Sequence, residues 1–179
     1  MITVTPEEFT LVDFDHAELL ALVTEVATTI GHDPAVDITV EVDQDIPLIG
    51  TQLRSIDPVD LYIEGGAMED PKRIRQFHAS GARVVVGRLL MMAMDRRSEE
   101  FGPVPGNEDI ELPLSTAWNT YVVGRLARLG FPSQRQRRLY TFRNRHGFTD
   151  AADAAFDKLW NSESLTWAEV AAISESAAG

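Results

Sequence analysis

The chain has 179 residues, of which 44% are hydrophobic and 25% charged, so it can bury the core of one ordinary globular domain. It contains no cysteine, which excludes disulfide bonds, thiolate metal centres, iron–sulfur clusters and a cysteine nucleophile. Its net charge of -12 argues against non-specific attraction to nucleic acid or to anionic lipid.

The N-terminal segment, residues 1–8, has neither a basic start nor an apolar run followed by small residues, so it does not resemble a secretory signal. Charged residues or glycine interrupt every apolar stretch well before the ~18 residues that a membrane-spanning helix needs. We therefore expect a cytoplasmic protein without a membrane segment.

The first predicted element is a helix over residues 16–30. Asp15 and Glu18 stand at the spacing of a capping box at its start, and apolar residues then recur at helical spacing. Gly31 and Pro34 supply the stop.

Three short strands are predicted next. Residues 38–42 and 59–64 alternate apolar and polar side chains, which is typical of strands with one buried face. Residues 46–53 include Pro47 and Gly50 and suit an edge or bulged strand. Together they predict a small mixed or antiparallel sheet.

A long helix is predicted from Asp70 and Pro71 to about Arg97, because an acidic N-cap followed by proline is a strong helix start. Its middle is apolar on most sides, which indicates the central buried helix of the domain.

The last third of the chain is predicted to be helical. Ser115, Thr149 and Thr166 are expected to cap helices, and residues 133–146 to form a further helix rich in arginine. The sequence therefore predicts an α+β fold: a small three-stranded sheet with a long buried helix, followed by a C-terminal helical region.

One domain over residues 1–179 is the expected organisation. Three prolines and two glycines fall within residues 102–113, which makes this segment a possible linker. The chain would then divide into an α+β core over residues 1–101 and a helical extension over residues 114–179.

Charge is split strongly along the chain. Residues 1–70 hold 16 acidic side chains and a single base, Arg54, whereas residues 112–149 hold seven arginines and no acid. The predicted interaction surface consists of the arginines of the helix at residues 133–146: Arg135, Arg137, Arg138, Arg143 and Arg145.

Two interpretations of these arginines stay open. Interleaved with Tyr140, Phe142 and His146, the arginines over residues 125–145 have the composition of a phosphate or nucleic-acid contact surface. They can equally pair with the acidic half of the chain, within the molecule or between subunits. The overall charge favours the second interpretation, so nucleic acid is an unlikely partner.

The sequence lacks the common catalytic motifs GxSxG, Walker A, GxGxxG and HExxH, and it predicts neither a metal site nor a cofactor. The weak catalytic candidates are His78, on the predicted buried helix, and Glu64 and Glu69, which flank two glycines between a strand and a helix. An enzyme acting on small molecules with a site of such scattered residues stays an alternative.

The order of elements over residues 15–97, an amphipathic helix, three strands and a long helix, resembles a minimal zincin-like metalloprotease domain. In that family the long helix carries HExxH, and the best-matching segment here is residues 85–91. The resemblance places the zinc ligands on Val86 and Leu90 and the catalytic base on Gly87, none of which can serve. It thus implies a fold that has lost its metal site.

The leading hypothesis is a non-catalytic scaffold or protein-interaction role, on a domain that the resemblance identifies as a degenerate metalloprotease-like one. Its partner would be another protein or a second copy of the chain, and the arginine-rich helical part would meet an acidic surface.

Overall fold

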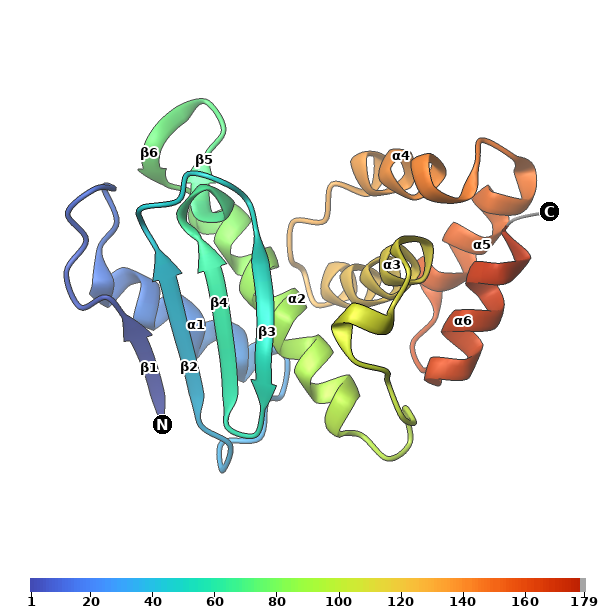
Figure 1. Ribbon diagram of the computed structural model, residues 1–179, viewed down its shortest axis with the longest axis horizontal. Coiled ribbons are helices and arrows are strands. Elements are labelled where there is room, and N and C mark those ends of the chain that lie inside the picture. Colours follow the sequence, from blue (N-terminus) through green and yellow to red (C-terminus); the bar gives the residue numbers. More distant parts are fainter. Residues whose placement is uncertain (178–179) are drawn as a thin grey trace. The chain divides into compact units, whose positions relative to one another are not determined.

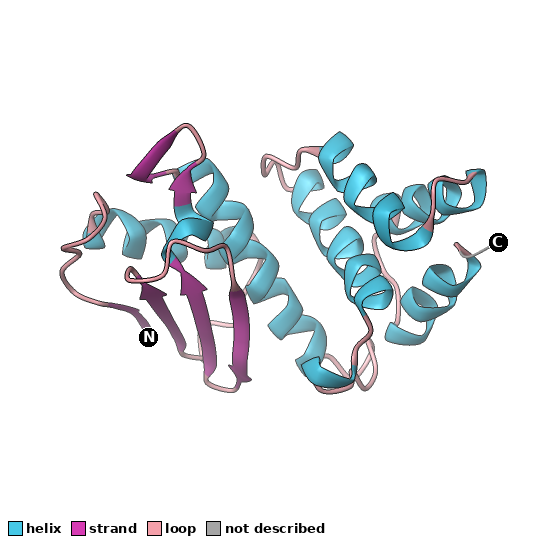
Figure 2. Cartoon of the chain, turned by 45° about the horizontal axis from the view of Figure 1, so that its top comes forward, coloured by secondary structure: helices cyan, strands magenta, loops and turns pink. Residues whose placement is uncertain are grey.

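The computed structural model describes residues 1–177 (Figure 1). The chain divides into two compact units, Met1–Arg97 and Ser98–Gly179. The boundary between Arg97 and Ser98 precedes the segment predicted as a linker. The first unit contains the sheet and the second is helical, so the α+β class is confirmed (Figure 2).

The sheet of the first unit has four strands and not three. They are β1 (Ile2–Thr5), β2 (Ile38–Asp43), β3 (Thr51–Ile56) and β4 (Val59–Glu64), in the order β1-β2-β4-β3. β1, β2 and β4 are parallel, and β3 pairs antiparallel with β4 at the edge. The missed strand, β1, has only four residues, too few for an alternating pattern to stand out, and its partner lies about 36 positions further along the chain.

Helices α1 (His16–Thr29) and α2 (Ala79–Arg97) cover one face of the sheet, and the other face is open (Figure 1). The strict alternation of β2 and β4 produces this arrangement: their apolar residues are buried, while the residues between them keep partial exposure. The buried set is Ile38, Val40, Val42, Val59, Leu61 and Ile63.

The predicted start of the long helix was wrong. Asp70 and Pro71 do not begin a helix but lie in a hairpin of β5 (Glu69–Asp70) and β6 (Arg73–Phe77). The Asp70 carboxylate accepts from the amide of Lys72, two residues on, which is a turn contact and not a helix cap. The long helix instead begins at Ala79.

The second of the three predicted strands, at residues 46–53, was placed too early in the chain, since β3 runs over Thr51–Ile56. Pro47 and Gly50 fall in the loop that precedes it, where a proline withdraws no amide from the sheet. α2 itself is confirmed as long and buried along its middle, including Val86, Leu89 and Leu90.

The second unit packs four α-helices: α3 (Leu112–Arg128), α4 (Arg135–His146), α5 (Asp150–Asn161) and α6 (Trp167–Ser176). Two short 3-10 turns, Gly65–Met68 in the first unit and Asn107–Asp109 in the second, complete the described elements. The core of the second unit is aromatic, with Trp118, Tyr121, Phe142 and Phe156 all buried.

The predicted caps of Thr149 and Thr166 are confirmed, and Thr166 forms a full capping box with Glu169. The predicted cap of Ser115 was wrong, because α3 begins one turn earlier at Leu112 with proline in its first turn. Among residues 1–177, no helix combines the length and the apolar character required to cross a membrane.

Candidate functional site

The five arginines predicted as an interaction surface all lie on α4, but the structure divides them into two groups. Arg135 and Arg143 are held by acids of α5, while Arg137, Arg138 and Arg145 are not. α4 packs against α3 and α5 through the buried ring of Phe142. The helix therefore has an anchored side and an outward side.

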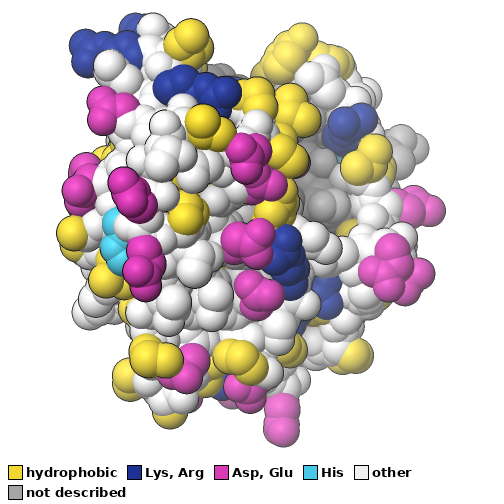
Figure 3. Space-filling model, turned by 60° about the vertical axis from the view of Figure 1, so that its left-hand side comes forward, with side chains coloured by type: hydrophobic (Ala, Val, Ile, Leu, Met, Phe, Trp, Pro, Cys, Tyr) yellow, Lys and Arg dark blue, Asp and Glu magenta, His cyan; other side chains and the backbone are white. Residues whose placement is uncertain are grey.

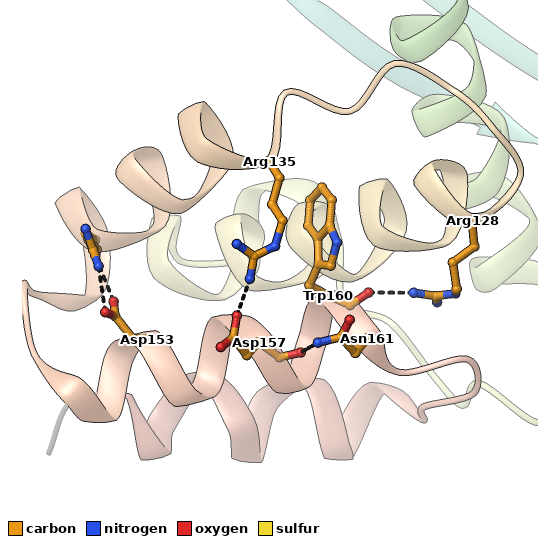
Figure 4. A network of polar contacts seen from close by, with 7 residues as sticks. Arg128, Arg135, Asp153, Asp157, Trp160 and Asn161 are labelled. Atoms are coloured by element: carbon orange, nitrogen blue, oxygen red, sulfur yellow. Dashed lines mark hydrogen bonds and ion pairs between the residues drawn. The ribbon is translucent and has the colours of Figure 1, made fainter.

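Arg143 makes a bidentate contact with Asp153. Its Nε lies 2.7 Å from Oδ1 and its Nη2 lies 2.6 Å from Oδ2 (Figure 4). This paired hydrogen bond raises the pKa of Arg143 and lowers the pKa of Asp153. The geometry fixes the C-terminal half of α4 on the start of α5.

Arg135 anchors the other end of α4. Its guanidinium is paired with the carboxylate of Asp157, as Figure 4 shows, and lies 5.2 Å from the ring centre of Phe156. An ion pair and a cation–π contact both hold the Arg135 guanidinium against α5, so Arg135 stabilises the second unit and is not available to bind a partner.

The remaining arginines have no acidic partner among the residues that the structure describes. Arg137 makes a long 3.4 Å contact with the amide oxygen of Gln134, and Arg145 is exposed. Arg138 is half-buried, and this desolvation, followed by the neighbouring charge of Arg137, lowers its pKa.

Two exposed aromatic rings accompany these arginines. Tyr140 is 58% exposed and Phe148 is 63% exposed, and their ring centres are 5.9 Å apart in an edge-to-face arrangement. The guanidinium of Arg143 stands 6.0 Å from the Phe148 ring and extends this contact towards α5. Large rings in such exposed positions are unusual for a surface without a partner.

We call this set the arginine–aromatic surface; it comprises Arg137, Arg138, Tyr140, Arg145 and Phe148. Sequence reasoning named its arginines and Tyr140 but missed Phe148. The available signal was an aromatic residue directly after Gly147, the glycine that ends α4, since a residue there commonly folds back onto the helix.

His146 belongs to the inner side of α4. Its Nδ1 lies 3.2 Å from the carbonyl oxygen of Phe142, and its Nε2 lies 2.9 Å from Oγ of Ser174 on α6. Because a carbonyl only accepts, the neutral ring carries its proton on Nδ1, and the Ser174 hydroxyl donates to Nε2. Burial lowers the pKa of His146.

The weak catalytic candidates hold separate structural positions. The Glu64 carboxylate accepts from the amide of Gly50, and Glu69 accepts from the amide of Arg75 at 2.8 Å. The carbonyl of His78 accepts from Ala82 at the start of α2. No hydrogen bond links these three side chains within residues 1–177.

The open sheet face carries a polar group that the sequence reading did not single out. Arg54 donates to Glu41 at 2.6 Å and lies 4.3 Å from the ring centre of Tyr62. The hydroxyl of Tyr62 donates to Asp43 at 2.8 Å, which raises the pKa of Tyr62 to about 12. Period-two alternation was the signal, because these residues alternate with the buried ones.

In the part of the chain that the structure describes, no group of three or more His, Asp or Glu side chains is arranged to hold a metal ion. The positions that the zincin-like resemblance assigns to zinc and base, Val86, Gly87 and Leu90, are all buried in α2. Comparison of the chain with family models, with curated proteins and with solved structures found no match.

Proposed function

We propose that the protein is a non-catalytic interaction module whose arginine–aromatic surface binds an acidic, apolar-bearing segment of a protein partner. One observation carries the proposal: α4 bears three arginines without an acidic partner in the described chain, Arg137, Arg138 and Arg145, together with the exposed ring of Tyr140, which meets the exposed ring of Phe148. Arginine and tyrosine are the residue types that most often dominate binding energy at protein interfaces.

The arginines that pair with α5 preorganise the helix that carries this surface. Arg143 and Arg135 tie both ends of α4 to α5, so the helix does not need to be ordered when a partner arrives. Less conformational entropy is then lost on binding, which leaves more of the contact energy as affinity.

The charge of the second unit favours a protein partner over nucleic acid. Residues 98–179 hold 11 acids and eight bases, so the unit carries a net charge of -3 even though α4 is basic. Such a field attracts a short acidic segment at contact distance but repels a polyanion at long range.

The zincin-like resemblance fits the same proposal, because its implied ligand positions are apolar and would leave a scaffold without metal. The lack of cysteine fits a protein that works in the reducing cytoplasm without disulfides.

The test is fluorescence anisotropy with a labelled peptide that alternates Asp or Glu with Leu and Phe. A matched peptide with Asn and Gln in place of the acids, and a single-stranded oligonucleotide of similar charge, are measured in parallel. We expect the acidic peptide alone to bind, with an affinity that falls as salt is added.

Arg137→Glu with Arg145→Glu should weaken peptide binding at least ~10-fold, and Tyr140→Ala by a similar factor. The control, Arg73→Glu with Lys158→Glu, reverses two exposed cations outside the surface and should leave binding nearly unchanged. Tighter binding of the oligonucleotide than of the acidic peptide would replace the proposal by nucleic-acid binding, and equal loss in both double variants would refute a specific surface.

A further inference from the structure

Three loops of the first unit meet at one edge of its sheet, because the carboxyl ends of the parallel strands β1, β2 and β4 lie together there. They are residues 6–15, residues 44–50 and the segment of residues 65–78 that contains the β5–β6 hairpin. Figure 1 shows them at the arrow ends of these three strands.

Hydrogen bonds lock the three loops to one another. The Gln44 side-chain oxygen accepts from the amides of Thr10 and Leu11, each at 2.8 Å. Arg75 donates to the carbonyl oxygen of Gln44 at 3.2 Å, and its own carbonyl accepts from Asp13 at 2.7 Å. The loops therefore form one ordered surface and not three independent segments.

Backbone packing reinforces this edge. A Cβ on Gly66 would stand 2.7 Å from the carbonyl carbon of Pro47, so only glycine permits this approach of the second loop. Arg75 adopts a left-handed conformation with φ of 67°, which is rare for a residue other than glycine.

This ordered edge exposes apolar side chains. Leu11 is 50% exposed, Leu48 63%, Ile49 76% and Ile74 83%. The first two loops, residues 6–15 and 44–50, also hold five acids and no base, whereas the third, residues 65–78, holds two acids and three bases. The three loops together hold seven acids and three bases, so the edge carries a net charge of -4. The exposed acids among them are Glu7, Glu8, Asp13, Asp15 and Asp45.

We call this edge the acidic–apolar surface; its members are Glu7, Glu8, Leu11, Asp13, Asp45, Leu48, Ile49 and Ile74. Figure 3, in which the left-hand side of Figure 1 comes forward, shows acidic, apolar and basic side chains interspersed on this side of the first unit. Its net charge is opposite in sign to that of the arginine–aromatic surface, and both surfaces expose apolar groups.

We propose that the acidic–apolar surface of one copy of the chain binds the arginine–aromatic surface of a second copy. The inference rests on the proposed function and names its partner. Arg137 and Arg145 match the acids, and the rings of Tyr140 and Phe148 cover exposed aliphatic groups such as Leu48.

The two surfaces differ, so the contact is head-to-tail. Such a contact leaves one free surface of each kind on a pair of molecules, and assembly continues until a ring closes or a chain grows. Because the contact is partly ionic, it weakens with added salt.

The experiment is sedimentation velocity of the full chain at low salt over a range of concentrations, with two neutralising variants. One variant, Arg137→Gln with Arg145→Gln, removes charge from the arginine–aromatic surface. The other, Glu8→Gln with Asp45→Asn, removes charge from the acidic–apolar surface. Each should weaken self-association about tenfold and leave thermal unfolding unchanged, since all four side chains are exposed.

Mixing supplies the decisive result. At a concentration where each variant alone is monomeric, the mixture retains one intact surface of each kind and should form a dimer of one copy of each variant. A wild-type chain that stays monomeric at low salt, or an assembly that neither variant weakens, would overturn the inference. If the wild type is monomeric and still binds the acidic peptide, the proposed function stands and only the identity of its partner is wrong.

Discussion

Gly124, in the middle of α3, is the position where the structure makes its sharpest prediction about stability. A Cβ there would stand 2.9 Å from both Cα and the carbonyl carbon of Trp160 on α5 and closer still to the carbonyl oxygen. That oxygen also accepts from Arg128 at 2.6 Å (Figure 4), so it is held in place. Gly124→Ala therefore forces α3 and α5 apart.

The expected loss of stability follows from two opposing terms. Overpacking of this kind costs about 3 kcal/mol when backbone must move, because no side-chain rotation relieves it. Alanine in place of glycine in a helix returns about 1 kcal/mol. We therefore expect Gly124→Ala to destabilise the second unit by about 2 kcal/mol.

Urea unfolding followed by tryptophan fluorescence measures this change. All three tryptophans, Trp118, Trp160 and Trp167, lie in the second unit, so the signal reports that unit alone. The control is Gly81→Ala in α2, where the added Cβ meets only the His78 ring at 2.8 Å, and a side chain can rotate away. Followed by far-UV circular dichroism, it should change stability by less than about 1 kcal/mol. A Gly124→Ala protein as stable as the wild type would refute the close-packing argument.

Four further predictions concern ionisable groups. Removing the ion pair between Arg143 and Asp153 by Arg143→Gln should lower the urea midpoint in the same assay, and an unchanged midpoint would contradict it. The pKa of Asp153 is lower in the folded protein than in the unfolded chain, so its ion pair stabilises the fold at pH values above the unfolded pKa, and this contribution is lost as the pH falls through the folded pKa. Asp153→Asn should therefore make the free energy of unfolding depend less on pH at acidic pH. The lowered pKa of His146 likewise gives stability that falls as pH drops below about 6.5, and His146→Gln should remove that slope. Absorbance titration should show Tyr62 ionising near pH 12, and Asp43→Asn should bring it down towards about 10; no shift would exclude the hydrogen bond.

Local signals in the sequence predicted much of the fold. The cap residues Asp15, Thr149 and Thr166 lie where they were expected, since capping depends on contacts within one turn. Alternation likewise located β2 and β4, because the period of two follows from the geometry of a single strand.

The same local reasoning failed where distant contacts decide the structure. Asp70 and Pro71 read as a helix start, yet Glu69 pairs with Phe77 and Arg75 bonds to Gln44, and these contacts stabilise a hairpin. β1 was missed for the same reason: it exists through pairing with β2, and four residues alone carry no clear pattern.

The candidate site shows the same division. Sequence by itself determined that arginine and aromatic residues concentrate on one amphipathic helix within an acidic protein. Only the packing of α4 on α5 decided that Arg143 and Arg135 are paired with acids, while Arg137, Arg138 and Arg145 have no acidic partner within residues 1–177. The physical reason is that the sequence shows which charged side chains are present, whereas the energy of an ion pair depends on the distance between its groups, and that distance is determined by how the helices pack.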